Sequence, residues 1–280
     1  MIVTQYASER TNGGNTAATV SAYAKLTLSF RVVGRRDDGY HSIEAEVVTV
    51  DFADELVFEP GRGLQVVDEV VGGLGLRDIT AGDSNLVNRA IRMVGANVGV
   101  RLVKRIPSGA GLGGGSADAA AVLRWAGYTS HKAAARLGAD VPFCLSGGKA
   151  RVCGLGEDVT QMPFEEKWFV LMMPPFGIDT GRVYESWDCL APSLQHSSTS
   201  DDGYFNDLES AALRLEPQLE LWRDILGNAT GRRPHLAGSG TTWYVEGTKE
   251  QLGLSGRDAL VMKSNRAPIV EACTLPARAL

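Results

Sequence analysis

Residues 107–117 read PSGAGLGGGSA, and this glycine-rich stretch decides the fold assignment. The preceding residues, VGVRLVKRI (98–106), alternate in a way that predicts a strand, and the following ADAAAVLRWAG (117–127) predicts an alanine-rich helix. Five glycines between a strand and the start of a helix allow several backbone N–H groups to point at one anion. A plain turn needs only one or two glycines, and each further glycine costs conformational entropy. We therefore interpret residues 107–117 as a phosphate-binding loop.

Three other nucleotide-binding signatures do not fit this loop. A P-loop reads GxxxxGK[ST], whereas the one Gly-Lys pair of the chain stands in GKA (148–150), without the hydroxyl that binds magnesium. Gly109, Gly111 and Gly114 match the GxGxxG of dinucleotide-binding domains, but the acidic residue expected about 20 positions later is missing. The HRD and DFG signatures of protein kinases are absent. The loop therefore indicates a phosphate site of another class.

Composition restricts the possible partners. The chain has 280 residues, of which 44% are hydrophobic and 22% charged, so it is long and apolar enough to bury a core. Its 28 Lys and Arg against 33 Asp and Glu give a formal net charge of −5, which supplies no positive field for nucleic acid or an anionic membrane. No apolar run approaches the roughly 18 residues of a membrane span, and the first residues do not resemble a secretory signal. We expect neither a nucleic-acid partner nor a membrane partner.

The cysteines indicate a reducing compartment. They stand singly, without CxxC pairs and without histidines at zinc-ligand spacing. Scattered cysteines of this kind are typical of reduced core residues in cytoplasmic proteins, so we expect a cytoplasmic location. The four cysteines are Cys144, Cys153, Cys189 and Cys273.

The oligomeric state stays open between a monomer and a homodimer.

Both halves of the chain mix helical and strand patterns, which predicts an α+β fold built from two modules. SAYAKLTLSF (21–30) alternates as a strand, and NLVNRAIRMVGA (85–96) has the periodicity of a helix that Asp83 or Ser84 can cap. The pattern of apolar and polar residues changes after Pro163. We expect a flexible arm over residues 1–19, an N-terminal module over 20–165 and a C-terminal module over 166–280.

Three motifs resemble a family of small-molecule kinases that includes galactokinase, homoserine kinase, mevalonate kinase and phosphomevalonate kinase, the GHMP kinases. Residues 107–117 match the second motif of that family, P-x-x-x-G-L-G-[GS]-[GS]-S-[AS], throughout. The Ala24-Lys25 pair resembles the first motif, and AGSG (237–240) resembles the third. The resemblance implies an N-terminal module like domain 2 of ribosomal protein S5, which binds ATP and carries catalysis, and a ferredoxin-like C-terminal module, which binds the substrate. ATP and Mg²⁺ are the implied cofactors.

Three further stretches narrow the resemblance to one branch of the family. They are GRRDDGYH (34–41), GADVPFCLSGGKARVCGLGE (138–157) and FNDLE (205–209). Members of this branch act on a small-molecule cytidine diphosphate alcohol. The resemblance implies ATP-dependent phosphorylation of the 2-hydroxyl of a cytidine diphosphate-linked methylerythritol, in the non-mevalonate route to isoprenoid precursors.

The resemblance also assigns catalytic roles. Asp140 stands in GADVPF, where similar enzymes place a carboxylate that accepts the proton of the substrate hydroxyl. Lys25 matches the lysine of the first motif, and a cation there would keep Asp140 ionised and stabilise developing charge. The family has Asn two residues after this lysine, whereas this chain has Thr27, which puts the positioning of the substrate hydroxyl in doubt.

The implied ATP contacts come mainly from the glycine loop. Backbone amides would hold the β- and γ-phosphates, the Ser116 hydroxyl would add a contact, and Asn85 would contact the nucleoside. The sequence does not identify the metal ligands. The loop residues assigned to ATP are Pro107, Ser108, Gly109, Ala110, Gly111, Leu112, Gly113, Gly114, Gly115, Ser116 and Ala117.

The implied substrate contacts lie in both halves of the chain. Tyr40 and His41 would meet the cytosine by stacking and hydrogen bonding. Tyr184 would cover the other face of the base, although a core tyrosine explains that residue equally well. Thr180 would lie near Lys25 and the methylerythritol end of the substrate.

Two alternatives stay open at this point. A relative acting on mevalonate, homoserine or a sugar would share the loop but would not need the Gly39-Tyr40-His41 turn. A nucleotide-binding protein without catalysis would share the loop as well, but the presence of both Lys25 and Asp140 argues against it.

Overall fold

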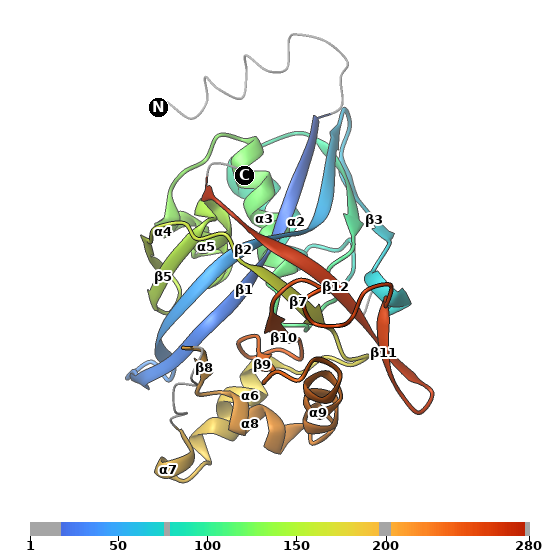
Figure 1. Ribbon diagram of the computed structural model, residues 1–280. Helices are drawn as coiled ribbons and strands as arrows, with labels where there is room; N and C mark the ends of the chain where they lie inside the picture. Colours follow the sequence, from blue (N-terminus) through green and yellow to red (C-terminus); the bar gives the residue numbers. More distant parts are fainter. Residues whose placement is uncertain (1–17, 76–78, 196–202, 278–280) are drawn as a thin grey trace.

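The computed structural model describes residues 18–75, 79–195 and 203–277, and its longest elements form one antiparallel hairpin (Figure 1). Strand β1 (Ala18–Arg35) pairs with β2 (His41–Glu59) over nearly its whole length. The register shifts between Tyr23 and Lys25, and such an irregularity re-aims the side chain beside it. The strand predicted over 21–30 is confirmed, and it is longer at both ends, where pairing with β2 continues.

Ten shorter strands extend the hairpin into a twelve-stranded sheet within the described residues. They are β3 (Gly63–Asp68), β4 (Gly99–Lys104), β5 (Lys149–Gly154), β6 (Asp158–Gln161), β7 (Trp168–Met172), β8 (Phe205–Asn206), β9 (His235–Leu236), β10 (Trp243–Glu246), β11 (Ala259–Met262) and β12 (Asn265–Leu275). The main path runs β3-β4-β2-β12-β7-β10-β9, and most neighbours in it are antiparallel.

The helices form two groups at opposite ends of the hairpin (Figure 1). The first group is α2 (Leu86–Val94), α3 (Gly114–Trp125), α4 (His131–Ala134) and α5 (Val141–Ser146), with the 3-10 turn η1 (Val71–Gly73) preceding it in the chain. The second group is α6 (Thr180–Asp188), α7 (Pro192–Gln195), α8 (Glu209–Leu215) and α9 (Gln218–Thr230). Helices and antiparallel strands thus mix throughout, which confirms the α+β class.

Strand β12 joins the two halves of the chain. Residues 269–273 pair with β7, and residues 274 and 275 pair with β2. The short strand β8 pairs with β1 in the same way across the halves. The module boundary between residues 165 and 166 stays a prediction, and hydrogen bonds cross it at both places. Most of the predicted arm lies outside the described residues, but residues 18 and 19 belong to β1.

One hydrophobic cluster anchors the glycine loop between the halves. Ile106, Ala110 and Leu112 are each 3% exposed or less, and they pack with residues of β1 and β2 on one side. Phe169 and Tyr244 belong to the same cluster from the C-terminal half. The burial of Ile106 and of the loop side chains of Ala110 and Leu112 removes apolar surface from water, which stabilises this connection by roughly 25 cal/mol per Å². The loop is therefore held by the core.

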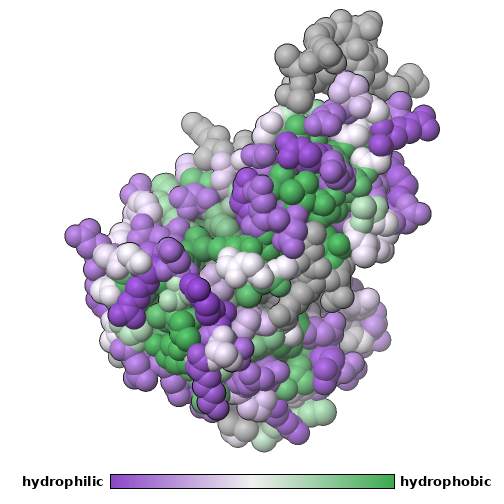
Figure 2. Space-filling model, turned by 90° about the vertical axis from the view of Figure 1, so that its right-hand side faces the viewer, coloured by the Kyte–Doolittle hydropathy of each residue, from purple (hydrophilic) through white to green (hydrophobic). Residues whose placement is uncertain are grey.

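Among residues 18–75, 79–195 and 203–277, none of the helices combines the length and apolar character needed to cross a bilayer. Figure 2 shows hydrophobic patches bordered by hydrophilic side chains on one face of the molecule. Large apolar side chains that are exposed include Trp168 and Val261.

Candidate active site

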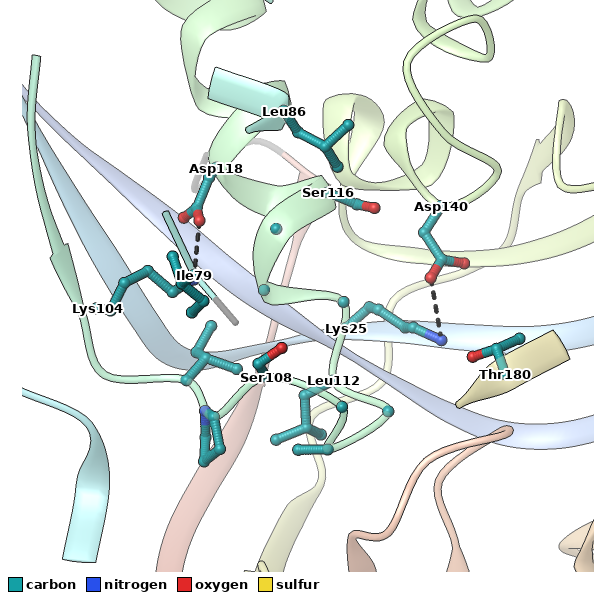
Figure 3. A pocket seen from close by; sticks show the side chains of 18 of the residues that line it. Lys25, Ile79, Leu86, Lys104, Ser108, Leu112, Ser116, Asp118, Asp140 and Thr180 are labelled. Carbon is teal, nitrogen blue, oxygen red and sulfur yellow. Dashed lines mark hydrogen bonds and ion pairs between the residues drawn. The ribbon is translucent and has the colours of Figure 1, made fainter. Parts of the chain in front are cut away.

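A pocket of about 360 Å³ opens where the glycine loop meets the start of α3 (Figure 3). Residues 107–116 of the loop all line it. Ala117, which was assigned to the same loop, is 1% exposed and packs in the core behind the pocket. Four charged side chains also line the pocket: Lys25, Lys104, Asp118 and Asp140.

The loop needs glycine at several positions for steric reasons. Gly109, Gly111 and Gly113 have φ angles of 72°, 83° and 67°, which residues with a Cβ atom rarely adopt. A Cβ atom on Gly111 would lie 2.8 Å from the Cα atom of Gly240 and would overlap the carbonyl oxygen of Ala237. The glycine loop and the 237–240 loop therefore pack backbone against backbone.

Backbone carbonyls of the loop anchor it to neighbouring segments, whereas N–H groups at the start of α3 are open. The carbonyl of Ala110 accepts a hydrogen bond from the backbone N–H of Thr242 at 3.1 Å, and that of Leu112 accepts one from Lys25 at 3.0 Å. Helix α3 begins at Gly114 with Gly113 as its N-cap, and its first turn contains no acidic residue. The open N–H groups of a helix start, together with the helix dipole, favour an anion there.

Lys25 and Asp140 form an ion pair beside the loop (Figure 3). The Lys25 ammonium lies 3.5 Å from a carboxylate oxygen of Asp140, and it also donates to the Thr27 hydroxyl at 3.3 Å. The Lys25 side chain is 12% exposed, whereas that of Asp140 is 48% exposed. Thr27 therefore contacts the lysine through its hydroxyl, and Asp140 keeps one side open to an incoming ligand.

The fold brings Asp140 to this point through the start of α5. Asp140 occupies the N-cap position of α5, with Pro142 in the first turn, but its side chain makes no capping hydrogen bond. The carboxylate therefore does not cap the helix. The carboxylate is directed to Lys25 instead, 115 residues away along the chain.

A pair of hydroxyls also lines the pocket. The hydroxyls of Thr180 and Ser239 are 2.9 Å apart, joining the start of α6 to the 237–240 loop. Thr180, Ser239, Lys25 and Asp140 all line the pocket. The sequence prediction that Thr180 lies near Lys25 is consistent with this arrangement.

The buried side chain of Asn206 positions the 237–240 loop. It is 5% exposed, and its amide donates to the carbonyls of Leu236 at 3.0 Å and Gly238 at 2.7 Å. Its side-chain oxygen accepts from the N–H of Leu208 at 2.9 Å. All hydrogen-bonding groups of this buried amide are therefore used to hold backbone.

We expect Asn206→Ala to lower the free energy of unfolding by roughly 1–3 kcal/mol, because it leaves buried backbone carbonyls without their donor. Denaturant unfolding followed by fluorescence measures the loss. The matched control is Asn228→Ala, which removes an exposed amide on α9 and is expected to change stability little. Equal effects of the two substitutions would contradict the positioning role of Asn206.

The residues assigned to the cytosine lie apart from this pocket. His41 and Tyr184 stack at 4.9 Å between ring centroids with 15° between their planes, and Trp187 meets His41 edge-on at 5.5 Å. Tyr40 is 66% exposed. Burial raises the pKa of Tyr184 well above its ordinary value, with the Asp140 carboxylate adding to the shift. Tyr184 thus lies near Asp140, one turn after Thr180 on α6.

Asp188 is a site residue that the sequence did not single out. Its carboxylate lies 2.8 Å from Nε2 of His41 and 3.7 Å from the guanidinium of Arg35. A carboxylate at Nε2 favours the proton on that nitrogen. It follows Trp187 on α6, and no spacing in the sequence connects it to a histidine 147 positions earlier.

Asn85 lines the pocket but is already engaged. It is the N-cap of α2, accepting from the N–H of Val87 at 2.9 Å and donating to the carbonyl of Thr80 at 2.8 Å. The prediction that Asp83 or Ser84 caps this helix is therefore wrong, because Asn85 itself has the extended backbone conformation of a cap. Its contact with a nucleoside stays a prediction.

Sequence reasoning also missed a buried charge cluster under the loop. Lys104 contacts Asp54 and Asp118, and all three residues are 3% exposed or less. The only available signal was a lysine at the end of an apolar strand and a single acidic residue in an alanine-rich helix. Neither feature indicates a partner by itself.

Known proteins match this chain over most of its length. The family model of the GHMP kinases N terminal domain matches residues 85–148. The 4-diphosphocytidyl-2-C-methyl-D-erythritol kinase of Clostridium beijerinckii is 31% identical over 255 residues, which cover 81% of this chain and 89% of that protein. The enzyme of the same name from Novosphingobium aromaticivorans is 36% identical over 251 residues, covering 84% and 86%.

Solved structures give the same result. A crystal structure of 4-(cytidine 5'-diphospho)-2C-methyl-D-erythritol kinase superposes with a TM-score of 0.69 at 30% identity, covering 92% of this chain and 99% of that chain. The mevalonate kinase of Methanococcus jannaschii has a TM-score of 0.57 at 13% identity, covering 94% and 99%. The second likeness shows a shared fold.

Proposed function

Because the chain belongs to the family of 4-diphosphocytidyl-2-C-methyl-D-erythritol kinases within the GHMP kinases, we propose that it phosphorylates the 2-hydroxyl of 4-diphosphocytidyl-2-C-methyl-D-erythritol with ATP. This places the chain in non-mevalonate isoprenoid precursor biosynthesis. The observation that carries the proposal is the shared pocket, in which the glycine loop and the Lys25–Asp140 pair face the same space.

The glycine loop supplies the phosphate site. Its backbone amides and the start of α3 bind the β- and γ-phosphates of ATP, and the Ser116 hydroxyl contacts them from the first turn of the helix. Little covalent chemistry is required of a protein in phosphoryl transfer, so positioning and charge neutralisation account for most of the catalysis. The buried anchors of the loop serve that positioning.

Lys25 and Asp140 act on the acceptor. The half-exposed Asp140 carboxylate accepts the hydrogen bond of the 2-hydroxyl. It takes the hydroxyl proton as that oxygen bonds to the γ-phosphorus of ATP, while the bond from the γ-phosphorus to ADP breaks and ADP leaves. The Lys25 ammonium pairs with that carboxylate and stabilises negative charge on the transferring group. The Thr27 hydroxyl accepts a hydrogen bond from the same ammonium.

Magnesium fits this pocket as a metal bound mainly by phosphate. Among the described residues there is no group of three or more His, Cys, Asp or Glu side chains that could enclose a metal ion. Mg²⁺ in kinases commonly takes one or two protein carboxylates and completes its shell with phosphate oxygens and water. Asp140 is the carboxylate in the pocket that is open enough to reach it, and it would be one ligand among phosphate oxygens and water, which would supply most of the binding. When bound, Mg²⁺ neutralises charge on the phosphates.

The cytosine end of the substrate lies toward His41 and the two rings that contact it, Tyr184 and Trp187. The exposed ring of Tyr40 covers the base, and His41 reads its edge while Asp188 holds the imidazole. His41 and Tyr184 are already in contact, so the base does not lie between those two rings. Tyr184 supports His41 in this arrangement and faces the substrate through its edge.

We expect His41→Ala to raise KM for the cytidine substrate roughly 10–100-fold while kcat changes little. The reason is that the side chain contributes base contacts that are equally present in the ground state and transition state. Steady-state kinetics with varied cytidine substrate measure this. His131→Ala is the control, because that ring contacts Ser146 instead. An unchanged KM in His41→Ala would favour a kinase for mevalonate, homoserine or a sugar.

The experiment that tests the function is an ADP-release assay with four acceptors: the cytidine substrate, mevalonate, homoserine and galactose. Turnover with the cytidine substrate alone supports the proposal. Turnover with another acceptor favours that member of the GHMP kinases, and nucleotide binding without any turnover favours an inactive relative. The cytoplasmic location and the oligomeric state, monomer or homodimer, stay predictions.

A further inference from the structure

A second set of charges lies between the end of β4 and α3, on the side of the pocket away from Lys25 and Asp140 (Figure 3). Lys104 is the last residue of β4, Asp54 lies on β2, and Asp118 lies in the second turn of α3. The Lys104 ammonium contacts a carboxylate oxygen of Asp54 and lies 2.8 Å from one of Asp118. Their side chains are 4% exposed or less. We refer to these three residues as the Lys104 cluster.

The Lys104 cluster holds both ends of the glycine loop. The other oxygen of Asp54 accepts hydrogen bonds from the backbone N–H groups of Arg105 and Ile106, at 2.5 and 2.8 Å, where the loop leaves β4. Asp118 connects the lysine to the helix that the loop enters. A Cβ atom on Gly114 would lie 3.2 Å from the Lys104 ammonium. The Lys104 ammonium therefore lies against Gly114, where the loop becomes helix α3.

Charge is unbalanced within the cluster. Two carboxylates share one ammonium, and the Oδ1 atom of Asp118 is buried without a hydrogen-bond partner among the described residues. Burial raises the pKa of Asp118 to about 7, Asp54 adds to the rise, and Lys104 opposes it. Burial lowers the pKa of Lys104, but the two carboxylates outweigh burial and leave it above its ordinary value. The lysine stays charged, and Asp118 is the group that titrates.

The neighbouring charges do not cancel this imbalance. Lys25 on β1 and Asp140 at the start of α5 pair with each other. Burial raises the pKa of the Cys144 thiol on α5 to about 12, so it is neutral. The arginines of α2 are engaged elsewhere, Arg92 with Asp83 and Arg89 with the carbonyl of Arg136. Arg124, further along α3, donates to the carbonyls of Cys144 and Ser21. With Asp118 ionised, the Lys104 cluster itself carries one excess negative charge beside the phosphate site.

Stability alone does not explain such a cluster. Replacing a buried ion pair by apolar residues of similar volume often leaves the stability of the fold unchanged or raises it, because each buried charge carries a desolvation penalty. Lys104 and Asp118 also line the same pocket as the loop. Phosphate bound above the cluster would repel an ionised Asp118 and would be attracted to Lys104, since low-dielectric surroundings screen charges weakly.

We propose that the Lys104 cluster is a proton-linked positioning device for the nucleotide, in which Asp118 takes up a proton when a nucleoside polyphosphate binds the glycine loop. The inference rests on the proposed function only in placing the phosphates at that loop. The proton removes the excess negative charge, and the unpartnered Oδ1 atom gains a hydrogen to donate. Asp118 acts through the loop and is a positioning residue.

The linkage has a definite sign. The protonated form of Asp118 favours nucleotide binding, so affinity is greatest below about pH 7, where the free protein already carries the proton. Affinity then falls as pH rises, by up to about tenfold per pH unit for one linked proton. Asp118→Asn imitates the protonated form in shape and charge. We expect its affinity to be independent of pH over the same range.

Titration calorimetry with Mg·ADP near pH 8, in buffers of different ionisation enthalpy, measures the linked proton. At that pH the phosphates of Mg·ADP are already ionised and do not contribute to the change. We expect net proton uptake by the wild-type chain, none by Asp118→Asn, and tighter binding by Asp118→Asn near pH 9, by about tenfold. Asp83→Asn is the matched control, because that exposed carboxylate pairs with Arg92, and its proton uptake should equal that of the wild type.

Each outcome decides between the readings. Binding of Mg·ADP to the wild-type chain without proton uptake overturns the inference and leaves the proposed function intact, and it does so even where Asp118→Asn fails to fold. Weaker binding by Asp118→Asn at every pH, with unchanged proton uptake, makes the cluster merely structural. Absence of nucleotide binding at any pH overturns the proposed function and this inference with it.

Discussion

Replacing Asp140 by Asn is expected to lower kcat roughly 10²–10⁴-fold, the range typical of a residue that accepts a proton in the rate-limiting chemistry. The amide keeps the size of the carboxylate but accepts a proton far less readily and forms no ion pair with Lys25, which lies 3.5 Å away. Binding of ATP should change little, because the glycine loop holds the phosphates. The expected result is therefore a loss in kcat at nearly constant KM for ATP.

Steady-state kinetics and nucleotide titration on the same preparation separate the two effects. Asp158→Asn is a suitable control, because Asp158 is an exposed carboxylate on β6 outside the pocket. An Asp140→Asn variant with nearly full turnover would mean that Asp140 does not take the proton. A variant that lost nucleotide binding instead would make Asp140 chiefly a metal or phosphate contact.

Gly111→Ala is expected to weaken ATP binding by about 100-fold or more. Gly111 has φ of 83°, and a Cβ atom there would overlap the carbonyl of Ala237 and lie 2.8 Å from the Cα atom of Gly240. Backbone atoms cannot move aside as a flexible side chain can, so the two loops must separate. A left-handed conformation adds a further cost of about 1–2 kcal/mol for a residue with a Cβ atom. A total cost of about 2.8 kcal/mol to the loop conformation that binds ATP corresponds to about 100-fold in affinity.

Isothermal titration with an ATP analogue measures the affinity, and thermal unfolding of the same variant reports whether the fold is retained. Gly34→Ala is the matched control: no atom lies within 4 Å of a Cβ atom built there, and its φ is not in the left-handed region. Gly111→Ala with unchanged affinity would contradict the requirement for close approach of the two loops. A parallel loss in Gly34→Ala would show that the effect is not specific to the loop.

The strands that sequence reasoning found are those with a local pattern. The strand at 21–30 alternates largely between buried and partly buried residues, and β4 begins in the same way. Strand β12 was not predicted, because its residues NRAPIVEACTL contain a proline and a short apolar run without clear alternation. Its burial comes from pairing with both β2 and β7, and no window of sequence contains that information.

The site residues divide in the same way. The glycine loop, Lys25 and Asp140 are recognisable because each stands in a local motif, and the structure brings all of them to one pocket. The aromatic group was predicted only in part. His41 and Tyr184 were named as substrate residues, but their direct stacking was not foreseen. Asp188 was missed, since it depends on the approach of α6 to the β1–β2 turn.

The sequence by itself determined the kind of chemistry, because a phosphate loop depends on which residues can leave backbone N–H groups open, and glycine spacing states that directly. Only the tertiary structure decided which charges share a space. Lys104 and Asp118 are 14 positions apart, and Asp54 is 50 positions from the lysine, yet they form one buried cluster. Electrostatic interaction depends on distance and burial in space, and neither quantity follows from position along the chain.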